Sequence, residues 1–215
     1  MTWQQRTSTP IGRTPGMNKI LLLFAHPKFE QSRVNKALLR GIQYLEGVTF
    51  HDLYEHYPAF HINVAREKEL LAAHDTIIWH HPLYWYNCPP LLKQWIDLVL
   101  EYGWAYGPGG DALNGKRCLH VVTTGGSEKV YCSEGRNLYS INEFLRPFEQ
   151  TARLCGMQYF APFAVMGTHQ LPEEALANYV HQYEQIIACL QTGRPLSSLK
   201  ECAFQTDIPA LQKEQ

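Results

Sequence analysis

The sequence predicts an α/β fold in which a parallel sheet of five strands carries helices on both faces. Residues 20–25 form an unbroken apolar run, which is typical of a strand buried on both faces. Apolar residues at helical spacing follow this run and recur later, so strands and helices alternate along the chain. Capping and turn residues separate these segments. Right-handed crossovers between parallel strands then place helices on both faces of the sheet.

Local signals define the individual elements. Strands are expected at residues 20–25, 48–54, 76–80, 116–124 and 158–165. The first helix begins at Ser32, a good N-cap residue, and ends at Gly47. Pro89 and Pro90 begin a later helix, because proline suits the first turn. Further helices are expected at residues 64–73, 140–155 and 172–191.

A single domain is expected over residues 17–193, since 215 residues are enough for one full core. Residues 1–16 lack the apolar segment of a secretory signal, and we expect them to be a disordered extension. Residues 194–215 show no period and form an unassigned tail. No apolar run approaches the roughly 20 residues that span a bilayer. The scattered cysteines are typical of buried, reduced thiols, so a cytoplasmic location is expected.

Several classes of function are excluded by missing patterns. A net charge of −1 does not suggest a nucleic-acid binder. No glycine occurs between Lys19 and Arg40, so the first strand lacks a G-x-G-x-x-G fingerprint. The chain also lacks a Walker loop, a G-x-S-x-G elbow and a C-x-x-C pair. Ten histidines include no H-x-x-x-H pair, and the adjacent His80 and His81 point to opposite faces, so no metal site is expected.

The loop after the first strand suits a phosphate. Its polar residues lead into a helix start, where backbone N–H groups are free. The Ser32 hydroxyl and the N–H groups of Arg33, Val34 and Asn35 would hold a phosphate or phosphomonoester. His26 would bind the phosphate or a ribityl hydroxyl. The alternative is simple capping by Ser32, with His26 as a satisfied histidine at the strand end.

The loop after the third strand, Pro82–Asn87, contains three aromatic residues in succession. Their faces suit a planar tricyclic ring, and the backbone amides of the loop can bind the polar edge of such a ring. The alternative is that these rings pack against the neighbouring helix.

The loop after the fourth strand, TTGGSEKVY, supplies two glycines that allow a ligand to approach the backbone closely. The N–H groups of Gly125 and Gly126 would face the pyrimidine carbonyl of a flavin and stabilise negative charge there. Tyr131 would donate a hydrogen bond to the same region. The alternative is a plain glycine turn with a surface tyrosine.

Taken together, AHP…S-x-x-N, HPLYWY, GWAYG-x-GG…L-x-GK and TTGG-x-x-x-x-Y resemble the NAD(P)H:quinone oxidoreductase family of flavodoxin-like flavoproteins. DLYEHYP, HPLYWYNCPPLLKQWID and LRPFEQTARLCGM are similar to its bacterial members that are ancillary subunits of glutathione-gated potassium-efflux systems. The resemblance implies a flavodoxin-like sheet of order 2-1-3-4-5 and a homodimer with each active site at the interface. It also implies FMN, with FAD as the alternative, NAD(P)H as co-substrate and a quinone-like acceptor.

The resemblance also assigns residues to roles. The phosphate contacts fall on His26, Ser32, Arg33, Val34 and Asn35. The contacts to the flavin ring fall on Pro82, Leu83, Tyr84, Trp85, Tyr86, Thr124, Gly125, Gly126 and Ser127. The active-site tyrosine matches Tyr131, which would act with the amides of Gly125 and Gly126. Trp104, Tyr106 and Asn137 would line the substrate pocket, with Trp104 and Tyr106 contributed by the neighbouring subunit.

One position departs from the better-known quinone reductases, which place a histidine six residues after the active tyrosine. Asn137 stands there in this chain, and a neutral amide cannot relay a proton as imidazole does. Two hypotheses follow. The first is a two-electron NAD(P)H oxidoreductase that works by a ping-pong cycle. The second is a regulatory subunit of a potassium-efflux membrane protein, peripheral at the inner face of the membrane, with weak catalysis.

Overall fold

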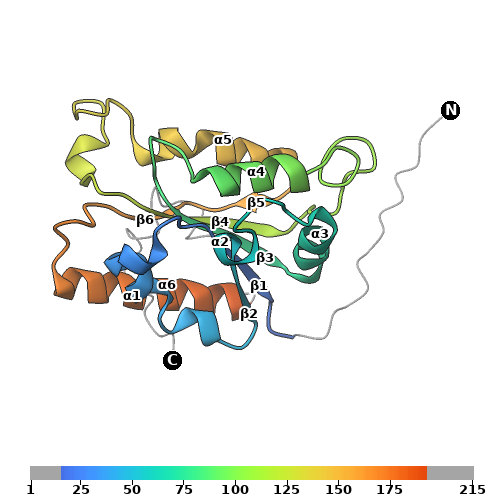
Figure 1. Cartoon of the computed structure of the whole chain (residues 1–215), viewed down its shortest axis with the longest axis horizontal. Helices are drawn as coiled ribbons and strands as arrows, with labels where there is room; N and C mark the ends of the chain where they lie inside the picture. The colour runs from blue at the N-terminus through green and yellow to red at the C-terminus, as the bar shows by residue number, and fades with distance from the viewer. Residues whose placement is uncertain (1–15, 193–215) are drawn as a thin grey trace, which may run out of the picture.

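One parallel sheet organises residues 16–192, the part of the chain that the computed structural model describes (Figure 1). The strand order is β2-β1-β3-β4-β5, as the family resemblance implied. The expected extension at residues 1–16, apart from Gly16, and the tail at residues 194–215 lie outside the described residues. The strands are β1 (Ile20–Phe24), β2 (Val48–Asp52), β3 (Thr76–Pro82), β4 (Arg117–Thr123), β5 (Gln158–Tyr159) and β6 (Phe163–Val165).

The last predicted strand, 158–165, is divided into β5 and β6, and both pieces pair with β4. The pairing moves from Cys118↔Tyr159 to Val121↔Phe163, so the β5–β6 segment holds one more residue than β4 over this interval. Pro162, within that interval, has no N–H for the ladder. An extra residue and a missing donor therefore interrupt the strand.

Several further boundaries differ from the prediction, and β3, for example, continues to Pro82 instead of ending at residue 80. The first helix, α1 (Arg33–Leu39), is shorter than expected, and a separate 3-10 turn follows at Ile42–Tyr44. The second strand ends at Asp52 because this side chain accepts hydrogen bonds from Tyr54 N and Glu55 N and caps a short helix, α2 (Leu53–His56). The other helices are α3 (Val64–Ala73), α4 (Pro90–Val99), α5 (Ile141–Leu154) and α6 (Glu173–Thr192).

Helices cover both faces of the sheet, with α4 and α5 on one side and α1 and α6 on the other (Figure 1). Alternate residues of β1 belong to the two cores: Leu21 and Leu23 face α4 and α5, and Leu22 and Phe24 face α1 and α6. This double burial explains the unbroken apolar run. None of the described helices is both long and apolar enough to cross a membrane. Because the strands are parallel, the loops after β1, β3, β4 and β6 meet at one edge.

Candidate functional site

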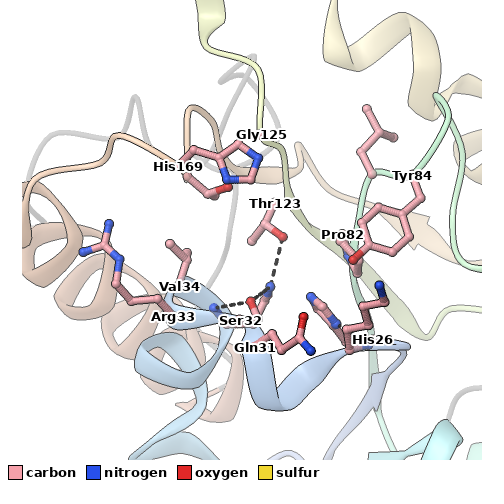
Figure 2. A pocket seen from close by; sticks show the side chains of 14 residues that line it. His26, Gln31, Ser32, Arg33, Val34, Pro82, Tyr84, Thr123, Gly125 and His169 are labelled. Carbon is pink, nitrogen blue, oxygen red and sulfur yellow. Dashed lines mark hydrogen bonds between the residues drawn. The ribbon is translucent and has the colours of Figure 1, made fainter.

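A cavity of about 420 Å³ lies at this edge of the sheet (Figure 2). Its walls come from residues between His26 and Asn35 after β1, from 82–84 at the end of β3, from Thr123 and Gly125 at the end of β4, and from Thr168 and His169 after β6. The structure therefore brings the three loops singled out from the sequence to one cavity. The crevice beyond the carboxyl ends of the strands is the usual ligand site of such sheets.

The first loop presents hydrogen-bond donors to this cavity. Ser32 is the N-cap of α1, and its Oγ accepts a hydrogen bond from Asn35 N at 3.4 Å. His26 Nδ1 accepts from Lys28 N at 3.1 Å, so the proton of the neutral ring is on Nε2. Burial lowers the pKa of His26, which favours this neutral form. Ser32 therefore caps the helix, as the alternative predicted, and it also lines the cavity, so its contact with a phosphate stays a prediction.

Arg33 lies at the edge of the cavity (Figure 2), and two contacts at the start of α6 hold its guanidinium. Its guanidinium forms an ion pair with Glu173 and donates to the carbonyl of Leu171. Both contacts join the start of α1 to the start of α6. Part of the positive charge that Arg33 would offer a ligand is therefore balanced by Glu173.

The three aromatic side chains of the loop after β3 lie in different surroundings. Tyr84 N and Asn87 N donate to each other's carbonyl oxygens at 2.9 and 3.0 Å, which closes a two-residue turn. Trp85 and Tyr86 at its centre have φ values of 48° and 64°. Tyr84 lines the cavity, whereas Trp85 is 92% exposed and Tyr86 stacks on Phe144 of α5 at 5.1 Å. The three rings do not form one wall, and Pro82 and Leu83 complete the lining from this loop.

The glycines of the third loop lie in crowded positions. A Cβ on Gly125 would lie 2.6 Å from His169 Nε2, and one on Gly126 would lie 2.8 Å from Val130 Cγ2. The neighbouring Thr124 donates from Oγ1 to the Gly126 carbonyl at 2.6 Å. The loop backbone therefore lies close to the side chains of His169 and Val130, and the Thr124 hydrogen bond joins its two ends. Gly125 lines the cavity, while Thr124, Gly126 and Ser127 lie outside its lining.

The proposed active-site tyrosine lies beside the cavity rather than in its lining. The Tyr131 ring meets Phe144 edge-on at 6.0 Å, so Tyr86 and Tyr131 share one contact on α5. Burial raises the pKa of Tyr131, which keeps its phenol protonated at neutral pH. Tyr131 can therefore act as a donor but not as a base.

The three residues assigned to a substrate pocket also lie outside the cavity lining. The Trp104 ring packs beneath Lys68 Nζ at 5.0 Å, which directs it toward α3. The Tyr106 ring contacts the Tyr102 ring edge-on at 5.7 Å. The backbone N–H of Asn137 donates to the Val130 carbonyl at 3.0 Å. Their assignment to a substrate pocket stays a prediction.

Sequence reasoning missed five residues of the lining: Lys28, Gln31, Thr123, Thr168 and His169. Thr123 is the last residue of β4, and it directly precedes Thr124, the first residue of this loop that was predicted to contact a flavin. Thr168 and His169 follow β6, and the rule that ligands lie beyond strand ends would have indicated them if it had been applied to the last strand.

The donor set suits a phosphomonoester joined to a flat ring. Among the described residues that line the cavity, the polar groups are hydroxyls, amides, imidazoles and cations, with no carboxylate. Pro82, Leu83 and Tyr84 give one side an apolar character. Residues 16–192 contain no group of three or more His, Cys, Asp or Glu side chains arranged to hold a metal ion. The cavity therefore fits FMN in its chemistry.

Comparisons with known proteins agree with this geometry. The sequence pattern of the flavodoxin-like fold matches residues 18–187. KefG, the glutathione-regulated potassium-efflux system ancillary protein of Enterobacter sp. (strain 638), is 46% identical over 170 residues, covering 79% of this chain and 93% of that protein.

Two solved structures are also similar. General stress protein 14 from Treponema denticola, in complex with FMN, has a TM-score of 0.76 and 40% identity, covering 80% of this chain and 99% of that chain. An NADPH-quinone reductase from P. pentosaceus has a TM-score of 0.72 and 32% identity, covering 79% of this chain and 97% of that chain. With the strand order and the cavity at the strand ends, these matches establish that the chain belongs to the flavodoxin-like fold family and is related to the potassium-efflux ancillary proteins.

Proposed function

We propose that this chain is a flavin-dependent NAD(P)H oxidoreductase that holds FMN and reduces quinones or similar electrophiles. The cavity carries the proposal, because three strand-end loops direct neutral and cationic donors into it and no carboxylate among the described residues lines it. The likeness to a protein in complex with FMN and to an NADPH-quinone reductase supports the same choice.

Each loop has its own task in this proposal. Ser32, His26 and the N–H groups at the start of α1 bind the phosphate, and Tyr84 and Leu83 pack against the ring. The ring's other contacts fall on Pro82, Trp85, Tyr86, Thr124 and Ser127. FMN held there would supply the redox chemistry of a ping-pong cycle, in which NAD(P)H gives up a hydride and a quinone then receives two electrons and two protons, one of them from solvent, to become a hydroquinone.

The protein supplies positive electrostatic potential where negative charge develops. The N–H groups of Gly125 and Gly126 donate toward the pyrimidine edge, and neither glycine has room for a Cβ, because the side chains of His169 and Val130 lie close to them. Tyr131 donates a further hydrogen bond, since its raised pKa keeps the hydroxyl protonated. Asn137 cannot take up a proton, so turnover is slower than in an enzyme with a histidine there.

A homodimer completes the site in this proposal. Trp104 and Tyr106 do not line the cavity of their own chain, and a second subunit would bring its copies to the open side. Sedimentation analysis tests the dimer: we expect twice the mass of one chain, and a monomer at micromolar concentration would count against it.

Turnover is tested with FMN-loaded protein, NADH or NADPH, and a simple quinone. We expect oxidation of the nicotinamide to depend on both flavin and quinone. Initial rates at varied concentrations of both substrates should give the parallel double-reciprocal lines of a ping-pong cycle. A loaded protein that consumes neither nicotinamide would remove the enzyme hypothesis.

A second function is favoured by the 46% identity to KefG and by Asn137. In this hypothesis the chain binds a glutathione-regulated potassium-efflux protein at the inner face of the membrane, and its catalysis is weak. Potassium efflux from vesicles that contain the transporter, measured with and without this chain, tests it. Stimulated efflux together with absent quinone reduction would leave the regulatory function as the main one.

A further inference from the structure

A series of hydrogen-bonded polar side chains runs from α6 to the cavity wall. Tyr183 on α6 and His80 on β3 are completely buried, and the Tyr183 hydroxyl lies 3.5 Å from His80 Nδ1. His80 Nε2 lies 2.9 Å from Asn35 Oδ1. Asn35 Nδ2 then reaches Ser32 Oγ at 2.9 Å and Thr123 Oγ1 at 3.1 Å (Figure 2). Of these five residues, Ser32, Asn35 and Thr123 line the cavity, whereas His80 and Tyr183 lie behind it.

The direction of these hydrogen bonds follows from donor and acceptor chemistry. Burial lowers the pKa of His80 well below its usual value, so the ring carries one proton. Because imidazole nitrogen accepts better than phenol oxygen, Tyr183 donates to Nδ1 and the proton of His80 is on Nε2. His80 therefore donates to Asn35 Oδ1, which leaves both Nδ2 hydrogens for Ser32 and Thr123.

This direction determines how the two hydroxyls face a ligand. Ser32 Oγ already accepts from Asn35 N and Asn35 Nδ2, and Thr123 Oγ1 accepts from Asn35 Nδ2. Their own hydrogens are then free to point into the cavity and to donate. A ring of donors favours an anionic oxygen, and hydrogen bonds to a charged group are stronger than neutral ones.

We propose that His80 is a positioning residue that, through Asn35, makes the hydroxyls of Ser32 and Thr123 donors and so gives the cavity its preference for a phosphomonoester. This inference rests on the proposed flavin site and adds Thr123 as a phosphate contact. It also explains why a histidine without solvent contact lies beneath the cavity, on the face of the sheet opposite to His81.

The test compares two ligands that differ by the phosphate alone, FMN and riboflavin, by the quenching of flavin fluorescence. Thr123→Val removes one donor with little change in shape. His80→Leu removes the bond to Asn35, whereas His80→Gln keeps an amide N–H that can donate to Asn35 Oδ1. Thr76→Val is the matched control, since Thr76 is buried at the opposite end of β3 and its Oγ1 has no hydrogen-bond partner.

We expect Thr123→Val and His80→Leu each to weaken FMN binding by about tenfold or more, the effect of one hydrogen bond to a charged group, with riboflavin binding unchanged. The ratio of the two dissociation constants should stay at the wild-type value in His80→Gln and Thr76→Val. A merely structural role for His80 would weaken both ligands equally.

A wild-type ratio in Thr123→Val and His80→Leu would overturn the positioning role. If His80→Leu does not unfold cooperatively, Thr123→Val against Thr76→Val still tests the phosphate contact that the proposal requires, and a wild-type ratio in Thr123→Val would overturn it. Wild-type protein that binds neither FMN nor riboflavin would overturn the proposed function itself, which is a different outcome from flavin binding with an unchanged ratio.

Discussion

At the scale of single residues, the sequence identified the loops but not every side chain that matters. Ser32 was predictable because an N-cap residue at a helix start has a strong local signal. His169 was not, because its role depends on contact with Gly125, which lies 44 positions earlier in the chain. Trp85 lies in a left-handed turn and is exposed, neither of which the sequence indicated, and its contact with a flavin ring stays a prediction.

Gly125 tests the close approach between the third loop and His169. Gly125→Ala places a methyl group 2.6 Å from His169 Nε2, so the loop or the imidazole must move. We expect about tenfold weaker FMN binding, since about 1.4 kcal/mol is one factor of ten. Titration of the apoprotein with FMN measures the change.

Two further variants make the result specific. His169→Ala combined with Gly125→Ala should recover part of the affinity, because the obstructing ring is gone. Gly41→Ala is the control, since its methyl group would lie 3.5 Å from the nearest atom and far from the cavity. Unchanged affinity in Gly125→Ala would show that the loop adapts and that the contact does not constrain the site.

Tyr131 tests the proposed donor. Tyr131→Phe keeps the ring on Phe144 and removes the hydroxyl, so we expect normal FMN binding and a reduction of the flavin by NAD(P)H that is about tenfold slower. Stopped-flow absorbance follows this half-reaction. Tyr44→Phe, at an exposed tyrosine, should have no effect. An unchanged rate in Tyr131→Phe would remove Tyr131 from the mechanism.

At the scale of elements, periodicity predicted which segments pair and pack, but not where each one stops. The apolar run of β1 was predicted because its residues face two cores. The break between β5 and β6 depends on register against β4, and register is not visible in one segment alone. The left-handed residues of the Tyr84–Asn87 turn were hidden for a similar reason, since aromatic residues rarely adopt that conformation.

The Tyr84–Asn87 turn is expected to cost stability. Trp85 has φ of 48° and is almost fully exposed, so its ring gains little from packing. Asparagine tolerates this conformation, and we expect Trp85→Asn to raise the free energy of unfolding by about 0.5–1 kcal/mol. Urea unfolding measures it. Tyr44→Asn removes an exposed ring without changing a left-handed residue and should give no gain; equal effects in both variants would contradict the role of strain.

At the scale of the whole molecule, the sheet order and the meeting of three loops at one edge were predictable from the alternation of strands and helices together with the family resemblance. Parallel strands put their carboxyl ends at the same edge, so loops distant in the chain become neighbours. The internal polar contacts were not predictable. His81 and His120, for example, meet at 2.6 Å between their Nε2 atoms across β3 and β4, and only the register brings them together.

These buried histidines predict sensitivity to acid. Burial lowers the pKa of His81 to about 4, below its ordinary value of 6.5, and it also lowers the pKa values of His80 and His120 well below that ordinary value. The unfolded chain then binds more protons than the folded one, so the stabilising effect is complete above pH 6.5 and is lost as the pH falls toward 4. His81 alone accounts for about 3 kcal/mol of this loss.

Urea unfolding at pH 7 and pH 5 measures the effect. We expect a clearly lower free energy of unfolding at pH 5, with an unchanged dependence on urea concentration. Equal stability at the two pH values would mean that the buried histidines are protonated in the folded protein.

The most direct test of the central claim is the identity of the resident cofactor. Purified protein is denatured by heat, and the released small molecules are separated by chromatography and compared with FMN, FAD and riboflavin. The account predicts FMN, either released from the protein or taken up when FMN is added to the apoprotein. No flavin in the supernatant and no uptake of added FMN would contradict it.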